Sequence, residues 1–433
     1  MDFKNRRVIA RWTVALSFVL SFSLMMVARQ ESEGPEVSAR ERIVVLISID
    51  GLPAEALADP RISAPTLRRL VREGASADAM TTSTPSVTWP SHTSMVTGSP
   101  PALHGVLFNG ILLRQGPAHP PRVEPWRDKD EMVRVPTVYD LAHEAGLTTA
   151  QVDWVAILNA PAITWAFPER PHPEGPVEQE MIQAGLVARR DIEEWAQANI
   201  TWKDEIWTRA GAYIIENHRP NLLLFHLLNL DSTHHRYGFG NLASNSAIAL
   251  ADARVQALLD SIERAGMDGL ATVLVVSDHG FKTATRSIRP NAALRERGLV
   301  RMEAGEVNCE AWVAPLGGVA MVYVTNPAER DRLLPQLKQL LGGLEGVEQV
   351  IEPAGYAELG LPDPADNDQM GDLLLTAASG YSFSGAAEGE AIVEIPDGAG
   401  AHGYPASDPD MDAVFIAWGY GIRPGARLDR VSN

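Results

Sequence analysis

Cysteine is nearly absent from this 433-residue chain. The single Cys309 cannot form an intramolecular disulfide, so no disulfide framework holds the fold. Basic residues are also few, with 37 Lys and Arg against 55 Asp and Glu, which gives a formal net charge of −18. A nucleic-acid backbone requires a basic face, so no nucleic-acid binding is expected. A small anionic substrate is not excluded, because bound metal ions can supply local positive charge.

Internal repeats, low-complexity tracts and a glycine-rich phosphate-binding loop are also missing. What is present is an ordinary globular composition, 45% hydrophobic and 21% charged, in a chain long enough to bury a large core.

The N-terminus carries four basic residues before an apolar stretch at residues 13–28, and a polar, Glu-rich spacer follows at residues 29–40. This pattern predicts a secretory signal peptide over residues 1–28 and an exported protein, periplasmic or secreted. The alternative is an uncleaved anchor, since the apolar stretch nearly reaches the roughly 17–25 residues that span a bilayer. Only in that case do we expect attachment to a membrane.

Apolar, β-branched runs alternate with segments of helical periodicity through most of the chain. The expected strands are residues 42–49, 148–155, 222–230, 272–276 and 413–418, and the expected helices are residues 64–73, 136–145, 204–217 and 245–265. Such alternation predicts an α/β fold, with a doubly wound, mostly parallel sheet and helices on both faces.

We expect one main domain over residues 41–433, with residues 290–400 as a smaller inserted subdomain. Within that insertion, a strand at 320–325, a helix at 329–341 and a strand at 347–351 predict a β-α-β unit on the main sheet. Residues 100–134 are rich in Pro, Gly and Arg and are expected to form a long loop near the functional site.

Aspartate and histidine cluster where the apolar runs end. The residues concerned are Asp50, Asp231, His235, Asp278, His279 and His402. Carboxylates and imidazoles at the ends of buried parallel strands predict a metal site at one edge of the sheet. Three of each suffice for two divalent ions, and the mixed nitrogen and oxygen ligands favour zinc over magnesium.

Each group also has a simpler interpretation when taken alone. Asp231 and His235 have the D-x-x-x-H spacing with which one helical turn can present two ligands, but they also fit a capping Asp and a surface His. His402 stands between glycines, in what we expect to be a flexible loop. The other nearby histidines (His92, His104, His226 and His234) are expected to be packed, to support the ligands from behind, or to be solvated, and His226, inside a predicted strand, is expected to be structural.

A hydroxyl group completes the set. Pro90 favours a first helical turn, which would place Thr88 or Trp89 at the cap, facing unpaired backbone N–H groups that attract an anion. An ordinary cap is the alternative. Next to two metal ions, a Thr88 hydroxyl can instead become a nucleophile.

Seven separated motifs occur in a familiar order: Asp50-Gly51, 87–92, Thr97-Gly98, His104-Gly105, 231–238, 277–280 and 402–404. In this order they resemble the alkaline phosphatase superfamily, with the type I phosphodiesterase/nucleotide pyrophosphatase branch as the nearest match, from residue 42 to the C-terminus. The resemblance implies one zinc ion at Asp231, His235 and His402. It implies a second at Asp50, Asp278 and His279, with the Thr88 oxygen completing that site.

The implied reaction is hydrolysis of a phosphodiester or nucleotide pyrophosphate in a small substrate, through a phosphothreonyl intermediate on Thr88. Ser91 departs from the pattern, because relatives usually carry an Asn there that helps to bind a phosphoryl oxygen. Ser91 is expected to take this place among the catalytic residues, with a contact that is weaker or mediated by water because its side chain is shorter. Relatives also continue beyond Asn433, so a closing segment is expected to be missing from this sequence.

Other functions remain open at this point. They are a phosphomonoesterase or phosphonate hydrolase, transfer of the phosphoryl group to an acceptor other than water, and a non-catalytic binding protein with the same fold. A sulfatase would carry a C/S-x-P-x-R motif at the nucleophile, which the segment from Thr88 to His92 does not match.

Overall fold

The computed structural model describes residues 37–303 and 305–433, and the chain divides into two compact units, Met1–Glu41 and Arg42–Asn433. In the first unit the described residues include one short 3-10 turn, Ala39–Glu41. The predicted signal segment and most of the spacer lie outside the described residues. Within the described ranges, no helix combines the length and apolar character needed to cross a membrane.

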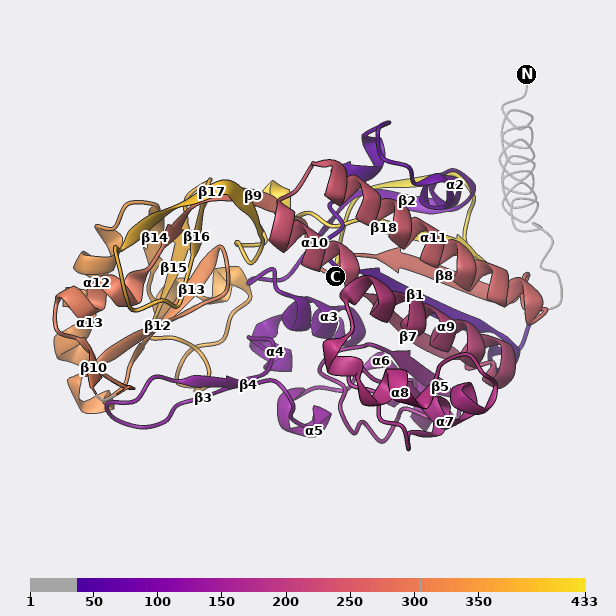
Figure 1. The fold of residues 1–433 in the computed structure, drawn as a ribbon, viewed down its shortest axis with the longest axis horizontal. Coiled ribbons are helices and arrows are strands. Elements are labelled where there is room, and N and C mark those ends of the chain that lie inside the picture. The colour runs from indigo at the N-terminus through magenta and orange to yellow at the C-terminus, as the bar shows by residue number, and fades with distance from the viewer. Residues whose placement is uncertain (1–36, 304) are drawn as a thin grey trace, which may run out of the picture. The chain divides into compact units, whose positions relative to one another are not determined.

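The second unit is built on an eight-stranded sheet (Figure 1). Its strands, in spatial order, are β19 (Ala426–Ser432), β2 (Ala75–Thr81), β18 (Phe415–Gly419), β8 (Ala271–Val276), β1 (Ile43–Ile49), β7 (Leu222–Leu227), β5 (Thr149–Val152) and β6 (Trp165–Phe167). β1 runs parallel to β7 and β8, β5 runs parallel to β7 and β6, and β18 is antiparallel to both of its neighbours. The predicted mostly parallel sheet is therefore confirmed.

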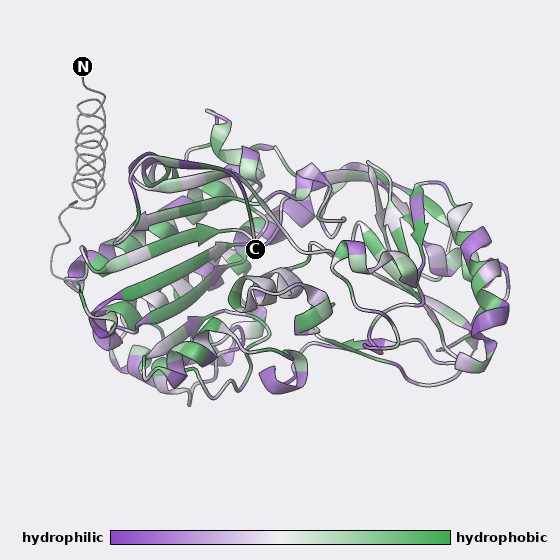
Figure 2. Ribbon diagram, turned by 180° about the vertical axis from the view of Figure 1, so that it is seen from behind, coloured by the Kyte–Doolittle hydropathy of each residue, from purple (hydrophilic) through white to green (hydrophobic). Residues whose placement is uncertain are grey.

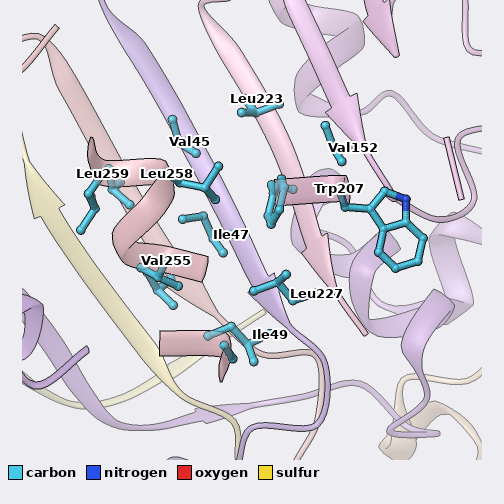
Figure 3. Packing of buried hydrophobic residues seen from close by; sticks show 14 of the residues in the cluster. Val45, Ile47, Ile49, Val152, Trp207, Leu223, Leu227, Val255, Leu258 and Leu259 are labelled. Carbon is cyan, nitrogen blue, oxygen red and sulfur yellow. The ribbon is translucent and has the colours of Figure 1, made fainter. Parts of the chain in front are cut away.

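Helices cover both faces of this sheet because its central strands are apolar on both sides. Val45, Ile47 and Ile49 of β1 belong to one cluster with side chains of α2 (Pro65–Glu73), α9 (Ile200–His218) and α11 (Leu242–Arg264). Figure 3 shows α11 side chains beside β1, and Trp207 of α9 beside Val152 and Leu223 of the neighbouring strands. The alternate residues of β1 face a second cluster that includes side chains from α3 (Thr88–Thr97) and α6 (Val138–Glu144). Figure 2 shows the resulting hydrophobic strands between more polar helices.

One predicted boundary is wrong in a way that matters for the site. The strand expected over residues 222–230 ends at Leu227, and α10 (Asn229–Tyr237) begins almost at once. The buried carboxylate of Asp204, on α9, accepts the backbone N–H groups of Leu228 (3.1 Å) and Asn229 (3.2 Å). It thereby satisfies N–H groups that a helix start leaves unpaired, and stabilises the turn from strand into helix.

A second group of sheets lies beyond β9 (Lys282–Ile288) and β17 (Ile392–Ala401), which pair antiparallel (Figure 1). Its largest sheet has the order β12 (Ala311–Pro315), β13 (Val319–Val324), β15 (Leu373–Ala377) and β14 (Val347–Ile351). The predicted strand, helix and strand correspond to β13, α13 (Arg330–Gly342) and β14. They do not join the main sheet, because both strands belong to this separate four-stranded sheet. Within it, β15 lies between β13 and β14 and pairs with both.

The remaining elements connect these parts. They are β3 (Ile111–Leu113), β4 (Arg122–Glu124), β10 (Val300–Glu303), β11 (Glu306–Cys309), β16 (Tyr381–Phe383), α4 (Pro101–His104), α5 (Lys129–Met132), α7 (Pro176–Gln183), α8 (Arg189–Glu193) and α12 (Pro290–Glu296). The expected long loop over residues 100–134 is thus partly ordered by α4, α5 and the β3–β4 hairpin.

Candidate metal centre and active site

The carboxyl ends of three adjacent strands bring the predicted ligands together. Asp50 follows β1, Asp278 and His279 follow β8, and Asp231 lies on α10 directly after β7. β1 lies between β7 and β8 in the sheet, and parallel strands end at the same edge. In an open α/β sheet, this is the edge at which ligands bind.

The first ligand set consists of Asp50, Asp278 and His279, all fully buried. The Nε2 atom of His279 lies 3.3 Å from Asp50 Oδ1 and 3.3 Å from Asp278 Oδ2, and the three ligand atoms all lie within 4.8 Å of one another. A tetrahedral zinc ion with bonds of 2.0–2.1 Å separates its ligand atoms by about 3.4 Å. The spacing therefore fits a metal ion.

The second ligand set consists of Asp231, His235 and His402. Asp231 Oδ1 lies 3.3 Å from His235 Nε2 and 3.7 Å from His402 Nε2, and the two imidazole nitrogens are 3.1 Å apart. The two sets adjoin, since the rings of His279 and His402 stack with 3.7 Å between their centres. One turn of α10 presents Asp231 and His235 on the same face, as the four-residue spacing predicts.

His402 does not lie in a flexible loop, contrary to the sequence-based expectation. It directly follows β17, whose last residue, Ala401, pairs with Lys282 of β9. Gly400 is required in this strand because an added Cβ would lie 2.2 Å from the carbonyl oxygen of His234. The β9–β17 pair therefore fixes His402 beside His279, which lies three residues before β9.

Four buried ligand atoms have no hydrogen-bond partner in the structure: Asp50 Oδ1, Asp231 Oδ1, Asp278 Oδ2 and His279 Nε2. Buried polar atoms are normally paired, and unpaired carboxylate oxygens that face one another are costly. One divalent cation at each ligand set would satisfy all four, so the residues present fit the metal ions that the sequence predicts.

Hydrogen bonds to the backbone set the orientation of each imidazole. His235, His279 and His402 use Nδ1 to donate to the carbonyl oxygens of Gly400 (3.1 Å), Gly280 (3.1 Å) and Ser86 (2.9 Å). Each ring therefore keeps Nε2 as an acceptor that points into the cluster, which is the tautomer that binds a metal. Burial lowers the pKa of His279 to about 4 and that of His402 to about 3, so both are neutral at pH 7.

The carboxylates need a cation. Burial raises the pKa of Asp50 well above its usual value, and the nearby charges of Asp278 and Asp231 raise it further. Burial also opposes ionisation of Asp231, but its interactions with His235, His402 and His279 together outweigh that effect and lower its pKa. A bound divalent ion would relieve the repulsion among the three carboxylates.

His226 supports the first ligand set, which the sequence analysis did not anticipate. Its Nε2 lies 3.0 Å from Asp50 Oδ2, and its Nδ1 lies 3.1 Å from Asp153 Oδ2. Burial lowers the pKa of His226, but the hydrogen bonds with Asp153 and Asp50 outweigh burial and raise it well above its usual value. The position of His226 inside β7 did not predict this role, because Asp153 follows a different strand, β5.

Thr88 begins α3 and is 8% exposed. The helix is capped by Val87 rather than by Thr88 or Trp89, and Pro90 is the third helical residue. His92, one turn later, donates from Nδ1 to the Thr88 carbonyl oxygen (2.8 Å), and the same Nδ1 lies 3.8 Å from Asp278 Oδ2. The start of α3 therefore adjoins the first ligand set.

Ser91 does not face the site. It is fully buried, and its hydroxyl forms a hydrogen bond with Ser83 Oγ at 3.0 Å. The weaker or water-mediated contact of Ser91 with a phosphoryl oxygen therefore stays a prediction, and it would compete with this hydrogen bond. Asn109 is the polar residue that reaches the start of α3 instead: its Oδ1 accepts the backbone N–H of Trp89 at 3.0 Å, which leaves Nδ2 as a free donor. No sequence motif linked Asn109 to the start of α3, because Asn109 is far from Thr88 along the chain.

Two cavities flank Thr88. The first, of about 260 Å³, includes three tryptophans in its lining, Trp89, Trp126 and Trp154. The second, of about 420 Å³, is lined by Val87, Asn109, His235 and His402 together with residues of the second group of sheets. Because Val87 lines one cavity and Trp89 lines the other, Thr88 lies at the boundary between them.

The fold is alkaline phosphatase-like. Solved structures of mouse and human ectonucleotide pyrophosphatase/phosphodiesterase 5 superpose with TM-scores of 0.67 and 0.66, at 16–17% identity, over 90% of this chain and 91% of each of theirs. One of the mouse structures is an inactive variant in complex with AMP.

The sequence comparison is more specific. Residues 44–405 match the family model of type I phosphodiesterases/nucleotide pyrophosphatases, and the chain belongs to this family. Rat ectonucleotide pyrophosphatase/phosphodiesterase family member 7 is 22% identical over 420 residues, which cover 95% of this chain and 85% of the relative. The protein is thus a hydrolase that acts on phosphoric ester bonds, and its family is metal-dependent.

Proposed function

We propose that this protein hydrolyses a small phosphodiester or nucleotide pyrophosphate by attack of the Thr88 hydroxyl on phosphorus, with two zinc ions as cofactors. One observation carries the proposal: two adjoining ligand sets with unpaired buried atoms lie beside the start of α3. Asp50, Asp278 and His279 would hold one ion beside the Thr88 hydroxyl, and Asp231, His235 and His402 would hold the other. When bound, such ions supply positive charge at the attacking and departing oxygens of an in-line displacement.

The residues around phosphorus have separate tasks. The Thr88 oxygen forms the new bond to phosphorus while the bond to the leaving oxygen breaks, which gives a phosphothreonine. The free Nδ2 donor of Asn109 is placed to donate a hydrogen bond to a phosphoryl oxygen as charge develops on it. Water then cleaves the phosphothreonine and restores the hydroxyl.

Substrate orientation follows from the two cavities. A planar base would fit the tryptophan-lined cavity, because aromatic rings stack favourably on one another. In that cavity the Arg170 guanidinium already lies 3.6 Å from the centre of the Trp126 ring. A nucleotide as the retained part of the substrate is therefore our first choice.

The proposal is tested with Thr88→Ala and Thr88→Ser in zinc-loaded protein. The substrates are an aryl phosphodiester of a nucleotide, an aryl phosphomonoester and an aryl sulfate. We expect the diester to react fastest, loss of turnover in the alanine variant, and partial activity in the serine variant. Near-normal turnover of Thr88→Ala would refute the nucleophile, and a rate order led by the monoester would refute the diester preference.

We also propose that the protein is exported, from the basic and apolar pattern of residues 1–28. Expression of the full chain followed by cell fractionation tests this. The N-terminal sequence of the exported protein distinguishes a cleaved signal, expected to end at Ala28, from a retained anchor.

A further inference from the structure

The cavity beside His235 and His402 lies where the leaving group must depart, if the proposed function holds. Thr88 attacks from the side of the first ligand set, and in-line displacement expels the leaving oxygen on the opposite side of phosphorus. His235 and His402 belong to the second set and line the 420 Å³ cavity. The group released from phosphorus therefore occupies this cavity, and the tryptophan-lined cavity holds the part that stays on Thr88.

The lining of the leaving-group cavity is mostly apolar. Apart from the two histidines, it comprises Val87, Phe108, Val123, Pro315, Leu316, Gly317, Phe383, Gly400 and Ala401, with Asn109 and Ser382 as the polar members. Among the described residues, neither Lys nor Arg lines it. A pyrophosphate group placed there would be partly desolvated without a cationic side chain to pair with it, which is unfavourable.

Two basic residues adjoin lining residues along the chain, Arg122 beside Val123 and the exposed Arg236 beside His235, and neither lines the cavity. Arg122 precedes Val123 in β4, and successive side chains of a strand point to opposite faces. The Arg122 guanidinium forms an ion pair with Glu124 and is largely exposed. The overall net charge of −18 also disfavours a highly anionic leaving group.

We propose that the leaving group of the natural substrate is uncharged and partly apolar. Within the proposed function, this selects phosphodiesters with a neutral alcohol or phenol as the leaving group over nucleotide pyrophosphates. We expect this preference to arise from the juxtaposition of His235 and His402 with Phe108, Leu316 and Phe383 in the lining of one cavity.

The test uses two esters of one nucleoside monophosphate, whose nitrophenol leaving groups differ only by a carboxylate on the ring. We expect zinc-loaded enzyme to favour the neutral ester by about tenfold or more in kcat/KM, the range expected when a buried charge lacks a partner. Val123 is 37% exposed, so Val123→Lys adds a cation to the cavity without disturbing the core. Val123→Gln is the matched uncharged control.

Val123→Lys should reduce the preference at least about fivefold by raising kcat/KM for the anionic ester, whereas Val123→Gln should leave the ratio unchanged. Equal rates of the wild-type enzyme on the two esters would overturn the leaving-group inference alone. An equal effect of Val123→Lys and Val123→Gln on the ratio of the two kcat/KM values would also overturn the leaving-group inference. Hydrolysis of neither ester would overturn the proposed function and, with it, this inference.

Discussion

Replacing His226 with leucine should destabilise the protein and weaken its metal binding together. The His226 ring is buried between Asp50 Oδ2, at 3.0 Å, and Asp153 Oδ2, at 3.1 Å. Its raised pKa means that a protonated ring holds two buried carboxylates. Leucine has a similar volume but no charge, so the variant leaves both carboxylates without their partner.

The magnitude follows from the burial of the group. Breaking a buried ion pair by removing one partner costs about 3–5 kcal/mol, because the remaining charge is left uncompensated. Burial raises the pKa of the Asp153 carboxyl to about 8 even with His226 in place, so this carboxyl takes up a proton when its partner is lost, which places the expected loss toward the lower end of this range. Adding Asp153→Asn to His226→Leu replaces this buried carboxyl with a neutral amide and should restore part of the loss, about 1 kcal/mol.

The assay is urea-induced unfolding of chelated and zinc-loaded protein, together with a zinc competition titration. The loss of stability should be largest in chelator, because a bound cation would also neutralise Asp50. Zinc affinity should fall about 10–100-fold, the usual cost of removing a group that orients a metal ligand.

His104→Leu is the matched control. His104 is equally buried, but its ring lies 3.1 Å from a serine hydroxyl, Ser94 Oγ, instead of contacting a carboxylate. This variant should lose stability without any change in zinc affinity. A loss below about 1 kcal/mol in His226→Leu, with zinc affinity unchanged, would refute the ion-pair reasoning.

Three further predictions follow from the same geometry. Burial raises the pKa of Asp204 from 3.8 to about 6, so the folded state binds this proton more tightly than the unfolded state does. The free energy of unfolding should therefore fall by about 2 kcal/mol as pH rises from 4 to 7. Asp204→Asn should remove this part of the pH dependence in urea titrations of chelated protein, and an unchanged difference between pH 4 and pH 7 would contradict it. Chelation should lower the thermal midpoint, and zinc should restore it in wild-type protein but far less in Asp278→Asn, as differential scanning fluorimetry can show. Asn109→Ala should lower kcat by about 10²-fold with a small change in KM if Nδ2 stabilises developing charge; a change confined to KM would assign it to substrate binding instead.

The central layers of the fold could be predicted from sequence because their signals are local. The apolar runs at residues 43–49 and 272–276 are short and rich in β-branched residues, which is typical of buried strands. The helical periodicity of α11 extends over many turns. The boundary after β7 was wrong because the start of α10 depends on Asp204, which lies more than twenty residues earlier. Likewise, the glycines before His402 suggested a loop, but pairing with β9 makes them part of a strand.

By itself, the sequence determined the chemistry of the site: the identities of the six proposed ligands, the hydroxyl at Thr88 and the family to which the chain belongs. Tertiary structure alone decided how these groups are supported. The imidazole tautomers depend on the carbonyl groups of Ser86, Gly280 and Gly400, and the orientation of Asp50 depends on His226. It also brought Asn109 beside the start of α3 and gave the cavity at His235 and His402 its apolar walls. The physical reason is that ligand identity is a property of single residues, whereas orientation, desolvation and cavity lining arise only when distant segments pack together.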